Sequence, residues 1–453
     1  MRKIIIGICV LVMGFTWETS AQKYWTLEEC IRLAQEKNIT VKRKELLTET
    51  SKNNLFQTKM DRLPSLGAGM DHNYSSGRSL NQEEYKWENA NLQQGSLGIQ
   101  SDLVLFNGFQ YYNAIQRSKF DLLQKLSELE KAKNDISINI AAAYLQILFS
   151  EELLEVAKSQ LELSKLQVER NKKLVEVGNV ARGNLLEIQA QAAREQVNLT
   201  NAENNLNIAY LTLTQILELD SIGDFRIQKP DSVNIEMAAP LMTVRDIYNQ
   251  ALLNMPEIKS SEYFLKYSEK NLAIARGKLS PRLTLTGSFY SRYNERAVDY
   301  LNPNSNYSYM DQIKDNQYKQ LSLSLNIPIF NRWNTRTQIN NSKILVQDAE
   351  YNLVDTRKDL YKAIQQAHAD AVNAFQNYVS RKEAVISSEE AFKYTQQKYD
   401  VGMSSAVDYN IAKTNLLKAK SDLVQSKYEF VFKGKNSRLF IKELLLRFKI
   451  LGY

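Results

Sequence analysis

The sequence predicts an α+β membrane protein that is mostly helical and contains two tandem structural repeats, each a strand pair plus a long coiled-coil-like helical hairpin. Three observations predict this class. Residues 110–176 contain no Pro or Gly and carry two interleaved apolar rows at heptad spacing, which is typical of a helix packed against other helices along its whole length. Four short segments alternate apolar and polar residues. Both patterns occur twice in the chain.

Matching motifs reveal the duplication. Phe330 repeats the place of Phe106 and Gly402 repeats that of Gly178, with equal offsets in the numbering: 330 − 106 = 224 and 402 − 178 = 224. An internal repeat of this length decides the fold class before any single element does. At about 1.5 Å per residue, the helix over 110–176 would extend about 100 Å, which is too long for a compact globular domain.

Residues 1–21 have the features of a secretory signal peptide. Arg2 and Lys3 precede an apolar run, and small residues lead to Ala21. The apolar run is too short to span a membrane, and its cysteine lacks the context of a lipid anchor. Cleavage would leave Cys30 as the only cysteine, so we expect no disulfide and a Cys30 that fills the core.

The formal net charge of +7 is concentrated at the end of the chain. Residues 433–453 form a basic amphipathic tail, in which six basic residues stand against one acidic residue, 6 − 1 = +5. The rest is nearly neutral, which argues against nucleic acid as a partner. The tail is expected to pack against the helices or to lie on an anionic membrane surface, and the order of the elements favours packing.

The expected elements follow one order in each repeat. A shorter helical pattern ends at a Pro, two strands follow, and a long helix then turns at a Gly into a return helix. In repeat 1 (22–218) these are a helix at 26–60, strands at about 64–74 and 96–106, the long helix 110–176 and the return helix 184–217. In repeat 2 (243–432) they are a helix at 243–278, strands at about 281–293 and 319–330, the long helix 333–400 and the return helix 408–432. Residues 219–242 are expected to form an equatorial linker that lies as a strap across the helices.

The four strands have the length of strands that cross an outer membrane. Leu321, Leu323 and Leu325 alternate with polar residues, and about ten residues suffice for a tilted strand. The polar connections 75–94 and 294–319 are expected to be outer loops. A soluble sheet with one buried face would show the same alternation. The secretory signal and the flanking tyrosines favour lipid, because aromatic belts mark membrane interfaces.

Four strands cannot close a barrel, and open strand edges are not tolerated in hydrocarbon. We therefore expect the chain to share its barrel with copies of itself. Two helical hairpins likewise cannot enclose a space alone. Both arguments call for a ring of copies, and neither gives its number.

At this point the chain resembles the TolC family of outer-membrane efflux proteins, over nearly all of residues 23–432. The resemblance rests on the duplicated order of elements and on the tip motifs that end at Gly178 and Gly402. It implies a homotrimer whose 12-stranded outer-membrane β-barrel continues into a periplasmic α-helical barrel. It also implies a periplasmic membrane-fusion adaptor and, indirectly, an inner-membrane pump of RND or ABC type as partners, with outer-membrane lipid around the barrel.

The resemblance also implies a constriction at the periplasmic gate. Asp408 lies six residues after Gly402, where the family carries an acidic residue that forms a ring. The family's second acid is replaced by Ile411, and Asn184 occupies the matching place in repeat 1. A ring of carboxylates favours cations. Alternatively, Asp408 caps the return helix.

The tips of the hairpins are candidates for docking on the adaptor. Gly is the usual residue at a left-handed helix end, so the glycines are also needed simply to make the turn. The candidate docking residues are Val177, Gly178, Asn179, Val401, Gly402 and Met403.

No catalytic, cofactor-binding or metal-binding motif is apparent, and His72 and His368 are the only histidines. We therefore expect no enzyme and no cofactor. The sequence favours the outer-membrane exit duct of a tripartite efflux or type I secretion system in a Gram-negative bacterium, extending into the periplasm. A periplasmic adaptor with one helical hairpin and a trimeric coiled-coil surface adhesin are the alternatives.

Overall fold

The computed structural model describes residues 24–81, 85–220, 223, 225–229, 243–299 and 307–439. The chain divides into two compact units, which we call the sheet unit (42–132 and 248–363) and the tip unit (1–41, 133–247 and 364–453). The expected signal peptide, much of the expected linker 219–242 and the end of the tail lie outside the described residues.

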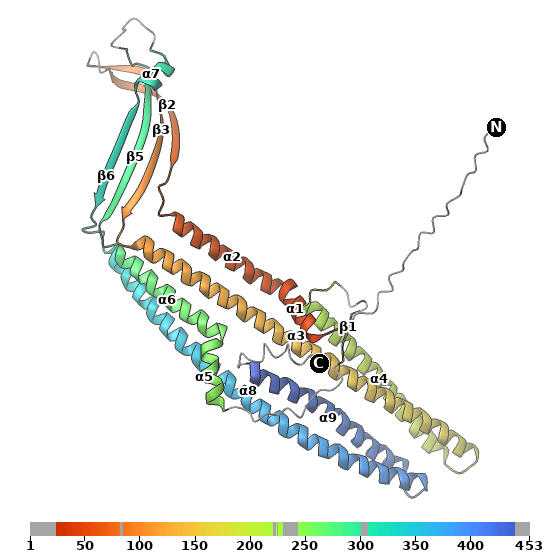
Figure 1. Ribbon diagram of the computed structural model, residues 1–453. Helices are drawn as coiled ribbons and strands as arrows, with labels where there is room; N and C mark the ends of the chain where they lie inside the picture. Colours follow the sequence, from red (N-terminus) through yellow and green to blue (C-terminus); the bar gives the residue numbers. More distant parts are fainter. Residues whose placement is uncertain are drawn as a thin grey trace, which may run out of the picture. The chain divides into compact units, whose positions relative to one another are not determined.

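The sheet unit contains one antiparallel sheet of four strands (Figure 1). Their order is β2 (Gly67–Asn81), β3 (Lys86–Phe106), β5 (Arg282–Asn294) and β6 (Tyr318–Asn326). The two expected strand pairs therefore join through β3 and β5, which come from opposite halves of the sequence. The strands β2 and β6 form the two edges.

One face of this sheet is apolar and the other is polar. Leu285 pairs with Leu103 on one side and with Leu323 on the other, so the three side chains share what we call the apolar face. One residue along, Thr286 pairs with Asp102 on the opposite face and donates a hydrogen bond to its Oδ1 at 2.7 Å. The alternation read from the sequence thus corresponds to two chemically different faces.

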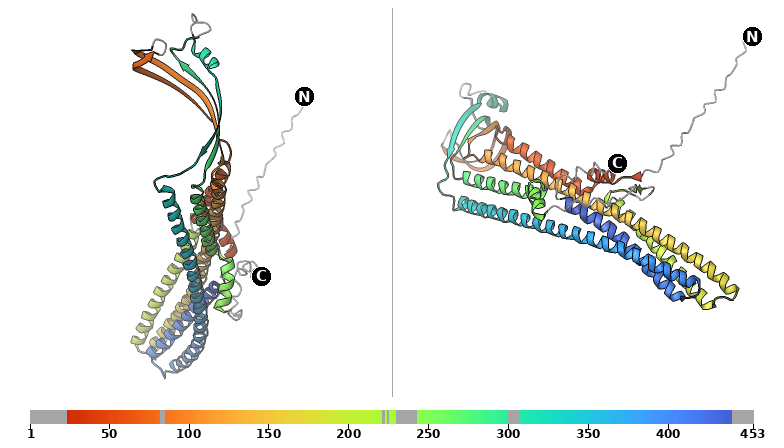
Figure 2. Two further views of the ribbon diagram at one scale, coloured as in Figure 1. Left: turned by 90° about the vertical axis from the view of Figure 1, so that its left-hand side faces the viewer. Right: turned by 60° about the horizontal axis from the view of Figure 1, so that its bottom comes forward.

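The expectation of an outer loop over 75–94 is wrong for most of its length. β2 and β3 stay paired up to Asn81 and Lys86, beyond the end of their neighbour β5 (Figure 2). The apolar–polar alternation does not predict this extension, because polar residues lie on both of its faces. The backbone hydrogen bonds of the strand pair continue there regardless of side-chain polarity. The first strand pair is therefore a long hairpin.

The fourth strand is shorter than expected, and its predicted end at residue 330 is wrong. β6 ends at Asn326, two residues before Pro328, which has no N–H to donate to a ladder. The connection 294–319, expected to be a loop, contains the short helix α7 (Tyr309–Asp315). This helix packs against β5.

The long helices have equal length. α3 spans Gln110–Glu176 and α8 spans Asn334–Asp400, each of 67 residues. Each contributes its first part to the sheet unit and its second part to the tip unit. Near the start of α3, Gly108 has φ +65°, and a Cβ built on Gly277 would lie only 2.6 Å from the Gly108 oxygen. Close backbone contact requires glycine at both places.

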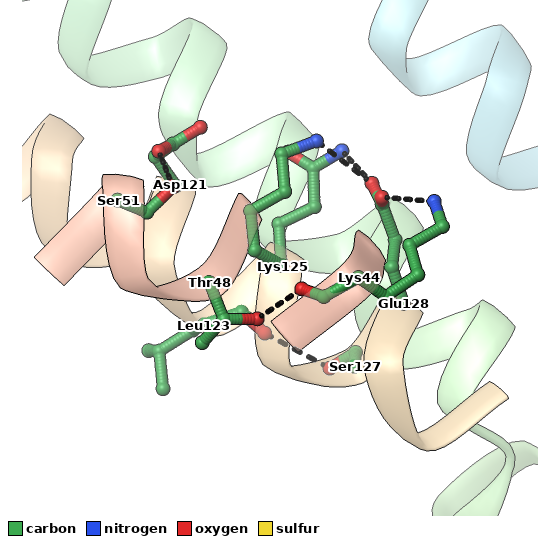
Figure 3. Close-up of polar contacts among 9 residues, drawn as sticks. Lys44, Thr48, Ser51, Asp121, Leu123, Lys125, Ser127 and Glu128 are labelled. Atoms are coloured by element: carbon green, nitrogen blue, oxygen red, sulfur yellow. Dashed lines mark hydrogen bonds and ion pairs between the residues drawn. The ribbon is translucent and has the colours of Figure 1, made fainter. Parts of the chain in front are cut away.

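Polar contacts join α2 (Ile39–Met60) to α3 within the sheet unit (Figure 3). The Glu128 carboxylate forms ion pairs with Lys44 at 3.0 Å and with Lys125 at 3.1 Å. The hydroxyl of Ser51 donates to Asp121 at 2.7 Å. These pairs are partly exposed, so they contribute little to the stability of the fold and serve mainly to align the two helices.

The two shorter helical patterns are each broken in the structure, contrary to the single helices expected at 26–60 and 243–278. The first divides into α1 (Leu27–Lys37) and α2 at Asn38, whose side chain donates to the Ile216 oxygen and accepts from the Thr40 N–H. The second divides into α5 (Val244–Asn254) and α6 (Pro256–Gly277) at Pro256, which stands at a helix start.

Besides α1, the described part of the tip unit consists mainly of four long helical segments. They are the second parts of α3 and α8 and the two return helices, α4 (Arg182–Ile216) and α9 (Ala406–Leu439). α9 thus continues past the expected end at 432 and includes the first residues of the expected tail. The pair Lys433–Asp370, at 2.7 Å, fixes the start of this extra length to α8.

The core of the tip unit lies under a two-stranded parallel sheet. β1 (Tyr24–Trp25) pairs with β4 (Arg226–Ile227), and the Tyr144 hydroxyl lies 2.6 Å from the Gln228 oxygen. Phe225 and Ile227 are buried in this core. Cys30 is fully buried in the same cluster, as its sequence context predicts.

Candidate gate and docking tips

Both long helices end in the same backbone motif. Gly178 has φ +73° and Gly402 has φ +78°. At the first tip, the Asn179 N–H donates to Leu174 O at 2.9 Å and the Gly178 N–H donates to Val175 O at 3.0 Å; the second tip repeats both bonds, from Met403 to Lys398 at 2.8 Å and from Gly402 to Tyr399 at 3.1 Å. Each is a Schellman motif, which satisfies the last carbonyls of a helix.

The turns present apolar side chains to the outside. Val177 and Val401 are each 69% exposed, and Met403 is 78% exposed. Asn179 is also exposed. A Cβ added at Gly178 or Gly402 would meet no atom within 4 Å. The six expected docking residues therefore lie on open surface within the tip unit.

Asp408 is part of a capping box at the start of α9. Its backbone N–H donates to Ser405 Oγ at 3.1 Å, and its carboxylate accepts from the Ser405 hydroxyl at 2.7 Å and from the Ser405 N–H at 3.3 Å. These hydrogen bonds from Ser405 hold the pKa of Asp408 below its usual value. The capping role is therefore realised. The carboxylate is nevertheless exposed, which leaves a second role open to it.

The other two expected gate residues have different surroundings. Asn184 is half-buried in the first turn of α4, with its N–H donating to Ala181 O at 3.0 Å. Ile411 is 55% exposed and lines a groove of about 460 Å³ between α4 and α9. The groove is lined by Glu187, Ala190, Arg194, Val407, Asn410, Ile411, Thr414 and Asn415.

Two contacts near the tips join the long helices of the two hairpins. Arg170 pairs with Asp400 at 2.5 Å, and the Tyr399 hydroxyl donates to Asn171 Oδ1 at 3.2 Å. Sequence reasoning missed these residues. The signal available in the sequence was a polar residue, Asn171, between Val168 and Val175 of one heptad row, and in the structure its side chain is 1% exposed. They hold the two hairpins together at their ends.

A buried polar layer lies further along the tip unit. Lys413 on α9 is 5% exposed and donates to Ser164 Oγ on α3 at 2.8 Å. Glu195 on α4 is 3% exposed. Burial lowers the pKa of Lys413, and the charge of Glu195 opposes that change. Three helices from both hairpins thus meet at one buried ammonium group, which sequence reasoning also missed.

No group of three or more His, Cys, Asp or Glu side chains that could hold a metal ion lies in the part of the chain that the structure describes. Of the helices within the described ranges, none has the length and apolar character to cross a membrane.

Known proteins share this arrangement. The family model described as "Outer membrane efflux protein" matches residues 30–218 and 247–431. The chain belongs to the outer membrane efflux protein family. Outer membrane protein TolC of Salmonella enteritidis is 23% identical over 454 residues, which cover 96% of this chain and 85% of that protein. The structure of the Campylobacter jejuni CmeC outer membrane channel superposes with a TM-score of 0.78 at 19% identity, over 92% of this chain and 85% of that chain.

A membrane protein from Pseudomonas aeruginosa also shares the fold, with a TM-score of 0.78 at 15% identity over 92% of this chain and 93% of that chain. The expected family, efflux function and outer-membrane location are confirmed, and a mostly helical fold with strand pairs is confirmed with them. This outer membrane efflux protein is therefore neither the adaptor nor the adhesin considered as alternatives.

Proposed function

We propose that this efflux protein is one third of a homotrimeric duct. The observation that carries the proposal is the pair of sheet edges, β2 and β6, because an outer-membrane sheet must close on itself. Three copies of a four-stranded sheet would give a 12-stranded barrel. β6 has nine residues and β2 has fifteen, so β2 of one copy can cover all of β6 in the next.

The two faces of the sheet support one orientation in that barrel. The apolar face would meet lipid, and the polar face, with Asp102 and Thr286, would line the exit. The helices would continue the barrel as a sleeve into the periplasm. Each chain carries two copies of one hairpin unit, ending at Gly178 and Gly402, so three chains would place six similar hairpins around the sleeve.

The hairpin tips would receive a periplasmic membrane-fusion adaptor, and through it an inner-membrane pump of RND or ABC type. The support is the open, apolar surface of the two glycine turns, with Val177, Val401 and Met403 exposed. Small apolar anchors around a close backbone turn suit packing against another helical hairpin. The cargo would then pass from pump to exterior without chemical change, which agrees with the expected absence of catalysis.

The gate would be the narrow end of the sleeve. Three Asp408 carboxylates around the axis would favour cations, and three copies of Ile411 instead of a second acid would weaken that preference. Opening would move the hairpins apart, against the contacts of Arg170 with Asp400 and of Lys413 with Ser164. Asp408 would keep its capping bonds throughout, because they lie within its own helix.

Cysteine crosslinking tests the shared barrel. Cysteines at alternate positions of β2 (Ala68, Met70, His72), each combined with Leu323→Cys on β6 in a Cys30→Ser background, should give a trimer ladder after oxidation in membranes. A matched pair on the interior strands, Leu103→Cys with Leu285→Cys, can only link within one chain and should stay monomeric. Monomer bands alone for every β2 position would overturn the trimer.

A further inference from the structure

The short helix α7 is fastened to one side of the sheet by several hydrogen bonds. Ser291 Oγ on β5 donates to Ile313 O at 2.8 Å, and Gln312 accepts from the Asn294 N–H at 2.9 Å. Gln312 also donates to Tyr307 O at 3.0 Å. Ser291 is 3% exposed and Gln312 is 1% exposed. These buried hydrogen bonds hold α7 in a fixed position on the sheet unit.

The side of the sheet on which α7 sits follows from strand parity. Ser291 is six residues from Leu285 in a strand whose pairing runs without a shift from Leu285 to Asn294, so both side chains lie on the apolar face. Tyr293 shares this parity, and its ring packs against Tyr309 of α7 with centroids 4.8 Å apart. The helix therefore covers the apolar face and lies outside the proposed barrel.

The height of α7 along the strand is close to that of a membrane interface. From Leu283 to Tyr293 the strand advances ten residues, about 33 Å at about 3.3 Å per residue. With a tilt of about 40° this corresponds to about 25 Å across the membrane, which equals the usual height of the apolar band. Tyr293 stacks on His72 at 6.3 Å and packs on Tyr309, as in an aromatic girdle.

The exposed residues of α7 are Met310, Lys314 and the two acids Asp311 and Asp315. Met310 is 62% exposed and stands about 200° around the helix from the buried Gln312. Lys314 follows Met310 by four residues, so it lies on the same side and is also exposed. On the neighbouring strand, Lys319 shares the parity of Leu321, and its Nζ lies 6.0 Å from the Phe289 ring centroid.

We propose that α7 is an interfacial foot, a short helix that contacts the outer leaflet of the membrane. This inference rests on the proposed barrel. Met310 would enter the boundary of the acyl chains, while Lys314 and Lys319 would meet the anionic headgroups of the surrounding lipid. The two acids of α7 are held by local hydrogen bonds: Asp311 accepts from the Ser308 hydroxyl at 2.6 Å, and Asp315 is hydrogen-bonded to the side chain of Tyr307. The connection that contains α7 would therefore brace the barrel wall and leave the exit clear.

Nitroxide labels test this placement through their collision with oxygen, which enters lipid, and with an aqueous nickel chelate. Met310→Cys, in a Cys30→Ser background and in phosphatidylglycerol-containing vesicles, should show an oxygen-to-nickel ratio several-fold above that of Tyr85→Cys. Tyr85 is 83% exposed next to the β2–β3 turn and serves as the aqueous reference. Leu323→Cys on the apolar face serves as the lipid reference.

The references separate two failures. If Leu323→Cys behaves like Tyr85→Cys, the lipid-facing barrel of the proposed function is wrong. If Leu323→Cys reports lipid while Met310→Cys matches Tyr85→Cys, the barrel stands and the interfacial foot is overturned.

A second pair of variants tests the fastening. Gln312→Ala should move the label at position 310 towards the aqueous value, because Gln312 holds α7 to β5. The matched control Gln317→Ala, at an exposed position, should leave it unchanged. Replacing phosphatidylglycerol by phosphatidylcholine should lower the oxygen-to-nickel ratio at position 310 but not at position 323, and equal ratios in both lipids would contradict the role of the lysines.

Discussion

At the two hairpin tips, α3 and α8 end in the same backbone geometry, whereas the return helices begin differently. The Schellman bonds of Gly178 and Gly402 correspond one to one. By contrast, α9 starts with the Ser405–Asp408 capping box, while α4 starts at Ala181 without any side-chain cap. The turn depends on a backbone that only glycine adopts easily, so it is alike in both hairpins. The helix start depends on side chains, which have diverged.

The hairpins also differ in how they meet the interior of the tip unit. Lys413 on the second return helix is buried against Ser164, whereas the residue at the matching position of the first return helix, Gln189 (413 − 224 = 189), is exposed. The second hairpin therefore supplies the ammonium that lies among three helices. Several substitutions, taken from the largest expected effect to the smallest, break or sharpen this comparison.

Lys413→Met should lower the free energy of unfolding by about 2 kcal/mol, because it removes the hydrogen bond from the buried ammonium group to Ser164. Gln189→Met, the matched change on an exposed helix surface, should cost less than about 0.5 kcal/mol. Thermal unfolding followed by circular dichroism in detergent measures both. Equal shifts in Tm for the two variants would remove the distinction between the hairpins.

The same lysine predicts a pH dependence. Its pKa is lowered in the folded state, so the unfolded chain binds more protons between the folded pKa and about 10.5. Stability from this group should therefore rise as the pH increases through that window. The rise should be absent in Lys413→Met, which Tm measurements at a series of alkaline pH values would reveal.

Gly178→Ala and Gly402→Ala should each cost about 1 kcal/mol, because a side chain at positive φ is strained while the surrounding space is open. The two costs should be equal, since the turns are the same. Gly→Asn at either place should cost less, because Asn tolerates this conformation. Denaturant titration of all four variants checks the equality, and a marked inequality would show that one tip is held by more than its backbone.

Exchanging the caps sharpens the contrast. Ser405→Ala should destabilise α9 by about 1 kcal/mol, and Ala181→Ser should stabilise α4 by a similar or smaller amount. Hydrogen exchange of the first turn of each return helix provides the measurement. An unchanged exchange rate at Asp408 in Ser405→Ala would mean that the capping box does not hold the helix start.

Arg170→Gln should have the smallest effect, below about 0.5 kcal/mol, because its side chain is 46% exposed and that of Asp400 is 35% exposed. A double-mutant cycle with Asp400→Asn isolates the pair. The coupling should disappear at about 1 M salt, where charges are screened within about 3 Å. A coupling that persists in high salt would indicate that the pair is buried in the assembled protein.

Sequence periodicity was sufficient for the features that repeat along a helix. The heptad rows and the absence of Pro and Gly predicted the bounds of α3 and nearly those of α8, and Gly178 and Gly402 marked the turns. The apolar alternation at Leu321, Leu323 and Leu325 likewise marked β6. In these elements the burial of the side chains repeats with the period of the helix or strand, so the local sequence pattern is enough to predict them.

Features that depend on a distant partner could not be read in this way. The break at Asn38 depends on the Ile216 carbonyl, far away in sequence. The β2–β3 extension is held by backbone pairing of polar residues, and α7 is held by Gln312 and Ser291. Among the candidate site residues, Asp408 has a recognisable capping pattern in the sequence. No local pattern distinguishes Lys413 from a solvent-exposed lysine, because its burial depends on the packing of α9 against α3 and α4.

The mass of the complex extracted from outer membranes tests the central claim, that one chain supplies a third of a duct. Multi-angle light scattering with correction for bound detergent should give three chains per particle. A particle that contains one chain, extracted without detergent, would contradict the account.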